Sequence, residues 1–253
     1  MKKITFNMLF WRGADFENRL KNAIFCLNRL KHFALYANNM GLDVDVLFFD
    51  FSSNKSHVDG AIHIPCIPGS FMRSEKLNMV IEYNYLFKTP DLFCVLDSDV
   101  FFMKDDYDKL IFEISNLNKN TIINGNVLDI KDGHSIDLTE NTISMMNVTT
   151  NIRVVGGLGG FFIIDFNELF NSGGYDERFT IWGGEDDDIA HRLKNNGLCI
   201  KKTNVTLYHL PHISLMQDAH KTQQYHDQCT LIGNNDTITK YSLITKKYLN
   251  KRN

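Results

Sequence analysis

The chain has 253 residues, of which 43% are hydrophobic, and this is enough to bury the core of one large domain. Its net charge of -3 gives no positive surface for nucleic acid, and no run of like charges indicates a disordered tail. The five cysteines lack CxxC spacing, which argues against a disulfide framework or a zinc cluster and favours reduced core residues.

The sequence also gives no membrane or export signal. No hydrophobic stretch reaches the length of a membrane span, and the N-terminal MKKITFNMLFW is interrupted by Arg12 too early for a signal peptide. If the chain is complete, we therefore expect a cytoplasmic protein. Four basic residues near the C-terminus favour a solvated end of the chain, with peripheral contact to anionic lipid as the alternative; they are Lys246, Lys247, Lys251 and Arg252.

The first elements form a strand, a helix and a second strand. Residues 4–10 read as a buried strand, and Asp15 is expected to cap a helix that ends at Gly41. Its predicted apolar positions are Phe16, Leu20, Ile24, Leu27 and Leu35. A strand over 44–49 completes a parallel unit, whose ligand should lie at the C-terminal ends of the strands. Trp11-Arg12-Gly13 follows the first of these ends.

The next elements lead to a pair of acids. We predict a short strand over 61–64, a helix that opens in FMRSEKLN and runs to about Phe87, and a buried strand over 92–96. This strand ends in Asp97-Ser98-Asp99. Two carboxylates at alternate positions can divide their work, since one can accept bonds from ribose hydroxyls while the other coordinates a hard cation between diphosphate oxygens.

The second half of the chain alternates strands with polar segments. We predict a helix over 105–115, strands over 121–126 and 161–164, and a functional loop in the polar, irregular stretch 126–151. Strands over 198–202 and 205–208 lead into His209-Leu210-Pro211-His212. From residue 217 the chain reads as helical, with a weak strand over 237–244.

The run Glu185-Asp186-Asp187-Asp188 is the most unusual feature of the sequence. These acids repel one another unless a cation, a helix N-terminus or a polar ligand offsets their charge. They open a helix that ends at Asn196-Gly197, and Asp188 stands four residues from Arg192, which predicts an ordinary surface pair. First-turn acids can simply complement the helix dipole. Trp182 and the two glycines that follow it instead favour a sugar site, because an aromatic face beside closely approaching backbone suits a sugar ring.

Three blocks of this region resemble the beta-1,4-galactosyltransferases: Gly156-Gly157, Gly173-Gly174-Tyr175-Asp176 and above all WGGEDDD. Related blocks occur in the chondroitin-polymerase and polypeptide N-acetylgalactosaminyltransferase families. The resemblance implies an α/β protein with the GT-A glycosyltransferase fold, a Rossmann-like, mostly parallel central sheet flanked by helices. It implies one catalytic domain over 1–253, with a nucleotide-sugar half over about 1–126 and an acceptor and catalytic half over about 127–253.

The same resemblance implies roles for particular residues. FMRSEKLN is similar to the family's FNRAKLLN block, and the implied nucleotide-sugar contacts are Arg12, Phe71, Arg73, Asn78, Asp97, Gly156, Gly157 and Trp182. The implied metal ligands are Asp99 with one or both of His209 and His212, whose spacing reproduces the family's Met-x-x-His pair. Asp186 would be the catalytic base, and the acceptor would meet Glu185, Trp182 and Asp187.

The implied activity is an inverting transfer of galactose or N-acetylgalactosamine from a UDP-sugar to a glycan, lipid-linked or free, with Mn2+ or Mg2+ as cofactor. The absence of a membrane anchor favours a bacterial-type enzyme in surface polysaccharide synthesis, at the inner face of the membrane. One alternative is a sugar-binding protein that kept the fold and lost turnover. Another is a haloacid dehalogenase-type phosphatase with Asp97 as nucleophile, but a strand-helix-strand unit precedes this motif, which in that family belongs to the first strand.

Overall fold

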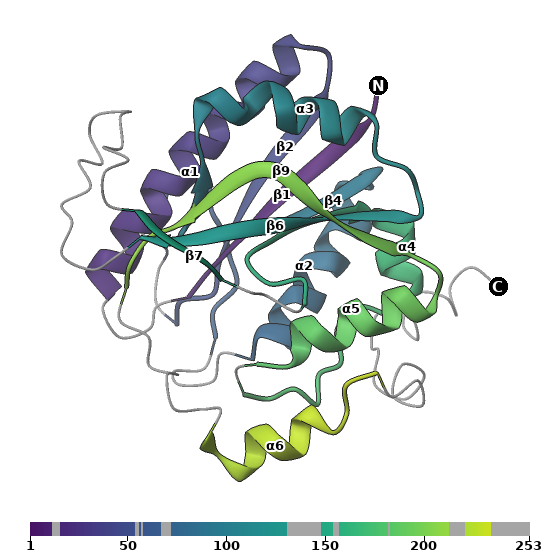
Figure 1. The fold of residues 1–253 in the computed structure, drawn as a ribbon. Helices are drawn as coiled ribbons and strands as arrows, with labels where there is room; N and C mark the ends of the chain where they lie inside the picture. The colour runs from purple at the N-terminus through teal and green to yellow at the C-terminus, as the bar shows by residue number, and fades with distance from the viewer. Residues whose placement is uncertain are drawn as a thin grey trace.

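The computed structural model describes residues 1–11, 16–53, 56, 58–66, 72–130, 148–153 (backbone only), 157–181, 183–212 and 221–233. In these residues one nine-stranded sheet runs through the molecule in the order β3-β2-β1-β4-β8-β6-β9-β5, with β7 paired to β6 (Figure 1). The strands are β1 (Lys3–Phe10), β2 (Asp43–Asp50), β3 (Ile62–His63), β4 (Leu92–Asp97), β5 (Val100–Phe102), β6 (Thr121–Ile130), β7 (Val148–Arg153), β8 (Phe161–Asp165) and β9 (Cys199–His209).

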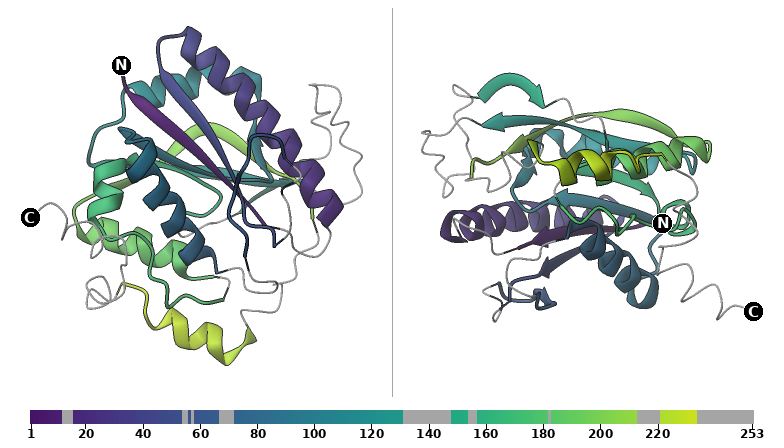
Figure 2. Two further views of the ribbon diagram at one scale, coloured as in Figure 1. Left: turned by 180° about the vertical axis from the view of Figure 1, so that it is seen from behind. Right: turned by 90° about the horizontal axis from the view of Figure 1, so that it is seen from below.

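Helices cover the two faces of the sheet (Figure 2). One face packs against α1 (Phe16–Asn39) and α3 (Tyr107–Ser115), the latter preceded by the 3-10 turn η1 (Lys104–Asp106). The other face packs against α2 (Arg73–Phe87), α4 (Phe166–Asn171) and α5 (Glu185–Asn195). A short helix, α6 (Gln223–Cys229), lies beyond α5 (Figure 1). None of the described helices is long and apolar enough to cross a membrane.

The strands alternate their side chains between the two cores, as period-two geometry requires. In β4, Leu92, Cys94 and Leu96 face the α1 and α3 side. Phe93 and Val95 of the same strand face the α2, α4 and α5 side. β8 alternates in the same way, so both central strands are buried on both faces. This explains why these segments read as nearly continuous apolar runs.

The sheet is mixed in direction: its first half is parallel as predicted, and in its second half only the pairing of β6 with β9 is parallel among the described strands. Strands β3, β2, β1 and β4 are parallel, but β8 is antiparallel to β4 and to β6, and β5 is antiparallel to β9. Parallel neighbours need long crossovers, usually helical. No helix of the described chain separates β6, β7 and β8, so these strands return antiparallel.

A buried polar network fixes α2 against the sheet. The Asn84 amide donates to Oδ1 of Asn7 at 2.8 Å and accepts from the Thr5 hydroxyl at 2.7 Å. Asn7 in turn donates to the carbonyl of Cys94 at 3.0 Å. Satisfied networks of this kind favour one arrangement of the packed elements over others. The start of α2, which carries Arg73, is therefore held in a definite place relative to β1 and β4.

Several predicted boundaries and faces need correction. In α1, Ile24 is 39% and Leu35 is 64% exposed, so these two are not core positions. The buried stripe runs instead through residues such as Ala23, Leu30 and Phe33, and the two exposed residues lie off its spacing. Asp15, the predicted cap, lies outside the described residues.

The predicted irregular stretch 126–151 is also shorter than expected, because β6 continues to Ile130 and β7 begins at Val148. Its middle, 131–147, lies outside the described residues, as does the weak strand predicted over 237–244. The two strands predicted over 198–208 form the single strand β9, whose pairing with β6 shifts register between Asn124 and Asn126. An irregularity of this kind is a β-bulge. The polar residues near it in the sequence led to the prediction of two separate strands.

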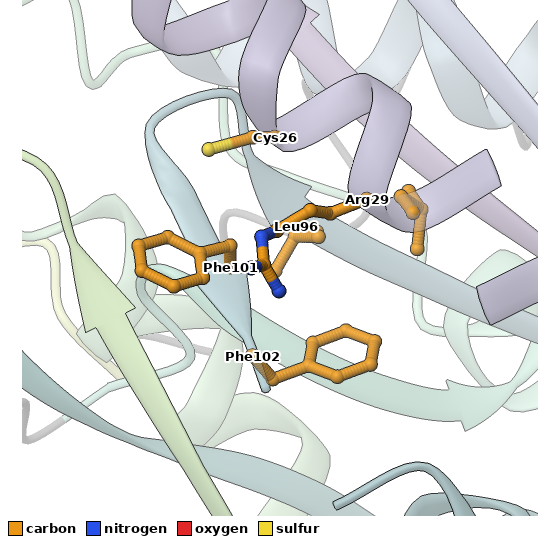
Figure 3. Close-up of a pocket in the computed structure, with 6 residues that line it drawn as sticks. Cys26, Arg29, Leu96, Phe101 and Phe102 are labelled. Carbon is orange, nitrogen blue, oxygen red and sulfur yellow. The ribbon is translucent and has the colours of Figure 1, made fainter. Parts of the chain in front are cut away.

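A small gap lies between α1 and β5 (Figure 3). The guanidinium of Arg29 lies over the rings of Phe25 and Phe101, 5.1 and 5.5 Å from their centroids. Cys26, Leu30, Leu96 and Phe102 also line it, and the space is too small for a water molecule. The gap is therefore part of the packing between α1 and β5 and is not a ligand site.

Candidate active site

Two groups of charged side chains meet where β4 ends. Asp97 is the last residue of β4, and Asp99 stands in the turn that leads into β5. The Asp97 carboxylate points to one group, which contains Arg73, Glu185 and Asp186. Asp99 belongs to a second group with two histidines. The Asp-Ser-Asp motif therefore joins two sites that are distinct in chemistry.

The second group can hold a metal ion. One candidate ligand atom from each of Asp99, His209 and His212 lies within 4.8 Å of the others. Nε2 of His212 lies 3.0 Å from Oδ2 of Asp99, and Nε2 of His209 lies 3.6 Å from Oδ1. One carboxylate and two imidazoles form a mixed oxygen and nitrogen set, which fits Mn2+ better than Mg2+ because Mg2+ prefers oxygen alone.

Strand pairing produces this grouping. β5 runs antiparallel to β9 and places Val100 opposite His209, and the Leu210 amide donates to the carbonyl of Asp99 at 2.8 Å. Burial alone would raise the pKa of Asp99, but the neighbouring His209 and His212 rings hold that pKa well below its usual value. The carboxylate is therefore ionised.

The first group is built around Arg73, the first residue of α2. Its Nη1 donates to Oδ1 of Asp97 at 3.0 Å, and its Nε lies 3.6 Å from Oε1 of Glu185 and 3.9 Å from Oδ1 of Asp186. Within the described part of the chain, Nε and Nη2 of Arg73 make no hydrogen bond although they are buried. A planar guanidinium with unused donors is suited to phosphate oxygens.

Burial shifts the pKa of both acids that face this arginine. It raises the pKa of Glu185 to about 7, assisted by the charge of Asp186 and opposed by Arg73. Burial likewise raises the pKa of Asp186, again opposed by Arg73, while Asp97 and Asp187 add to the rise. Oδ1 of Asp186 accepts no hydrogen bond from the described residues. A half-buried carboxylate with a raised pKa and a buried, unused oxygen can accept a proton from a bound hydroxyl.

Glycines allow the acidic helix to approach the site. Gly183 and Gly184 have φ angles of 100° and 91°, which favour glycine, and the Gly183 amide donates to Oε2 of Glu185 at 2.9 Å. Gly157 lies against the backbone of Asp186 and Asp187, where a Cβ atom would collide with main-chain atoms. The absence of a side chain at Gly157 lets the first turn of α5 lie at this position, and the predicted contact of Gly157 with the nucleotide sugar stays a prediction.

The tail contributes to the same turn. Gln228 of α6 donates through Nε2 to the carbonyl of Gly183 at 2.6 Å and to that of Ile181 at 3.2 Å. Gln228 is only 5% exposed. The sequence predicted a helix here but gave no reason to connect it to the acidic block.

Asn78 uses its side chain inside the protein. It is 3% exposed, its Nδ2 donates to the Tyr175 carbonyl and to Oε1 of Glu177, and its Oδ1 accepts from the Tyr175 amide. The Asn78 amide therefore holds the loop that carries Tyr175, and the predicted nucleotide contact stays a prediction. The phenol of Tyr175 is buried near Arg73, with its hydroxyl unbonded among the described residues.

The other residues for which the sequence made a prediction fall into three groups. Asp188 and Arg192 pair as predicted by spacing, but they are buried and do not form a surface pair. Asp187 is half-buried at the start of α5. Four predicted residues lie outside the described part of the chain: Arg12, Phe71, Gly156 and Trp182.

The comparisons with known proteins agree with this picture. The model of a family described as the N-terminal domain of galactosyltransferase matches residues 142–216, which include Asp186 and both histidines. This is less than half of the chain. No curated protein has significant sequence similarity to it.

Solved structures share the fold over most of the chain. The catalytic domain of Drosophila beta1,4galactosyltransferase 7 in complex with xylobiose superposes with a TM-score of 0.57 and 12% identity, covering 95% of this chain and 84% of that one. A mutant of the Drosophila enzyme in complex with manganese, UDP-Gal and xylobiose superposes with a TM-score of 0.51 and 14% identity. The match covers 87% of this chain and 74% of that one. GalNAc-T7 in complex with UDP, GalNAc and Mn2+ superposes with a TM-score of 0.55 and 15% identity, covering 85% of this chain and 45% of that one.

These findings confirm the predicted resemblance to galactosyltransferases and the GT-A glycosyltransferase fold. They do not support the phosphatase alternative. In that alternative Asp97 would be a nucleophile, whereas its carboxylate is engaged by Arg73 at 3.0 Å.

Proposed function

We propose that this chain is a metal-dependent, inverting glycosyltransferase that moves galactose or N-acetylgalactosamine from a UDP-sugar to a glycan acceptor. The observation that carries the proposal is the junction at the end of β4, where a metal-ligand group and a buried arginine-carboxylate group share one Asp-Ser-Asp turn. The family match and the shared fold support the same class of enzyme. By this proposal, about 1–126 bind the nucleotide sugar and about 127–253 bind the acceptor within one domain.

The metal would be held by Asp99, His209 and His212, and when bound it would offset negative charge on the diphosphate. Arg73 contacts Asp97, whereas the histidines contact Asp99, and two of its donor nitrogens make no hydrogen bond to the described residues. Its part is to bind a phosphate oxygen and to balance charge as the bond to the leaving group breaks. The neighbouring carboxylates Asp97 and Glu185 hold the guanidinium in place.

Asp186 is the base of the proposed reaction. Its Oδ1 takes the proton from the acceptor hydroxyl, the hydroxyl oxygen forms a bond to the anomeric carbon, and the bond from that carbon to the diphosphate oxygen breaks. The diphosphate leaves with the bonding electron pair. Because attack and departure occur on opposite faces of the sugar in a single displacement, the anomeric configuration inverts. Glu185, Asp187 and Trp182 would bind the acceptor.

The donor, the acceptor and the location stay part of the proposal. The relatives of known structure are complexes with UDP-Gal, with UDP and GalNAc, and with xylobiose, so a UDP-hexose and a glycan are the first compounds to test. We propose a role in surface polysaccharide or glycoconjugate synthesis, on a free or lipid-linked acceptor, at the cytoplasmic face of a membrane.

The test is a screen of nucleotide sugars by thermal shift, with and without Mn2+. The correct donor should raise the melting temperature only when Mn2+ is present. The same donor should then be hydrolysed slowly without an acceptor and faster with the correct glycan. A protein that binds the donor and never consumes it would be a sugar-binding protein on this fold, and the enzymatic proposal would be rejected.

A further inference from the structure

Three adjacent strands bring a second carboxylate to the metal group. β9 lies between β6 and β5, and its last residue, His209, pairs with Asp129 on one side and with Val100 on the other. Residues paired in this way project to the same face of the sheet. Asp129 therefore lies beside the His209 side chain on β6, and Asp99, in the turn just before Val100, lies near it on the β5 side.

The imidazole of His209 bridges these two acids. Its Nδ1 lies 3.0 Å from Oδ1 of Asp129, close enough for an ion pair although the present orientation does not meet hydrogen-bond geometry, and its Nε2 lies 3.6 Å from Oδ1 of Asp99. A carboxylate at Nδ1 favours the form of the ring that carries its proton on that nitrogen. Nε2 then carries the lone pair of the ring, and it lies near Asp99 and His212.

His212 has a different neighbour. Its Nδ1 lies 3.0 Å from Nη2 of Arg19, which belongs to α1. A guanidinium has donors and no acceptor, so Arg19 cannot take a proton from this nitrogen. It also places a positive charge beside the ring that would help bind a cation. The surroundings of the two histidines are therefore unequal.

We propose that Asp129 is a positioning residue that makes His209 the principal histidine ligand of the metal, with His212 as the weaker one. This inference rests on the proposed metal-dependent function and goes beyond it, because it orders two histidines that the sequence left equivalent and adds a residue that no motif contains. Metal-bound histidines regularly donate their second nitrogen to a carboxylate, and loss of that partner costs about 10- to 100-fold in metal affinity.

The experiment measures Mn2+ binding to the metal-free protein, using the paramagnetic resonance signal of free Mn2+. Asp129→Ala should weaken binding by about 10- to 100-fold. Asp129→Asn keeps an acceptor oxygen without the charge, and its loss should be smaller. Asp105→Ala, which removes an exposed acid in η1, controls for the change in net charge and should bind as the wild type does.

A second readout separates positioning from a structural role. Nitrogen-15 spectra of the histidines in the metal-free protein report which ring nitrogen carries the proton. His209 should carry it on Nδ1 in the wild type and lose that preference in Asp129→Ala, while the melting temperature without metal stays the same. His209→Ala should also weaken Mn2+ binding more than His212→Ala does.

Wild-type affinity in Asp129→Ala, or a larger loss in His212→Ala than in His209→Ala, would overturn the inference and leave the proposed function standing. A wild-type protein that does not bind Mn2+ would overturn both. The two failures are thus distinguishable in one set of titrations.

Discussion

Asp188 accepts a 2.8 Å hydrogen bond from Nε of Arg192 in the interior of the protein, where the two side chains are 0% and 2% exposed. The arginine also donates to the carbonyls of Ser172 and Gly174 at 3.2 and 2.8 Å. The other oxygen of Asp188 accepts from the Gly233 amide at 3.1 Å. The fourth acid of the run therefore ties α5 to the loop before it and to the segment after α6, and its role is structural.

We expect Asp188→Ala to lower the free energy of unfolding by about 3 to 5 kcal/mol, because removal of one partner leaves a buried, uncompensated guanidinium. Denaturant unfolding followed by circular dichroism measures this loss. Asp187→Ala, one residue earlier and half-buried, is the matched control and should cost less than about 1 kcal/mol. Equal losses in the two variants would show that the buried pair of Asp188 and Arg192 stabilises the protein no more than a half-buried acid does.

Gly157→Ala tests the close contact between the glycine segment and the acidic helix. The added Cβ would overlap main-chain atoms of Asp186 and Asp187, which cannot rotate away as a side chain could. We expect α5 to shift at its N-terminus and transfer to fall by about 100-fold or more, the usual cost of misplacing a catalytic group by about 1 Å. Gly197→Ala is the control at the other end of α5: it strains a residue with φ 90° in open space, so it should cost about 1 to 2 kcal/mol of stability and leave transfer intact.

The raised pKa of Glu185 predicts a pH dependence of stability. The folded state holds this proton up to a pH of about 7, whereas the unfolded state releases it near the ordinary value of 4.5. Between these values the folded state binds more protons, so the free energy of unfolding should fall as the pH rises from about 4.5 to 7 and then level off.

The shift corresponds to at most about 3 kcal/mol. Glu185→Gln should flatten the curve for the metal-free protein, measured as urea midpoints across this pH range. The raised pKa of Asp186 acts in the same direction, so a residual slope should remain. A curve for Glu185→Gln that matches the wild type would remove Glu185 as the source.

The sequence predicts the site best where its parts are local. The glycines and acids of 183–188 and the spacing of His209 and His212 are continuous motifs, and the antiparallel pairing of β5 with β9 brings Asp99 to the histidines. Partners that meet only across strands or loops were missed. Asp129 joins His209 through the pairing of β6 with β9, in a stretch that reads as a loop in the sequence.

The burial of a side chain also cannot be predicted from local sequence patterns. The i,i+4 spacing of Asp188 and Arg192 predicts their contact, but whether the contact faces water depends on which segments cover it. Asn78 is a similar case. Its amide matched a nucleotide-binding block, yet the Tyr175 peptide and Glu177 use its hydrogen-bonding capacity, because the chain folds back over α2.

We predict that nucleotide binding and transfer depend on the metal group. Two phosphates beside carboxylates repel one another without a cation between them. EDTA should abolish transfer, added Mn2+ should restore it, and Asp99→Asn should weaken Mn2+ binding in titrations of the metal-free protein. Transfer at an unchanged rate after chelation would show that the group formed by Asp99, His209 and His212 does not hold a required cation.

The last prediction concerns the base. Asp186→Asn keeps the shape of the side chain beside Arg73 but cannot accept the acceptor's proton, so kcat should fall by about 10² to 10⁴. Binding of the UDP-sugar and of Mn2+ should persist, as measured by thermal shift, because Asp99, His209, His212 and Arg73 are intact. Asp187→Asn is the neighbouring control and should retain the larger part of kcat.

Stability gives the internal check on this assignment. Asp186 faces Arg73 at 3.9 Å with its Oδ1 unbonded among the described residues, whereas Asp188 is fully bonded in the core. Neutralising a half-buried carboxylate whose pKa is raised removes a cost of ionisation, so Asp186→Asn should be at least as stable as the wild type at neutral pH. A loss of kcat accompanied by a loss of folding would return Asp186 to the structural role that Asp188 has. A loss of kcat in a stable protein that still binds donor and metal is the signature of a base.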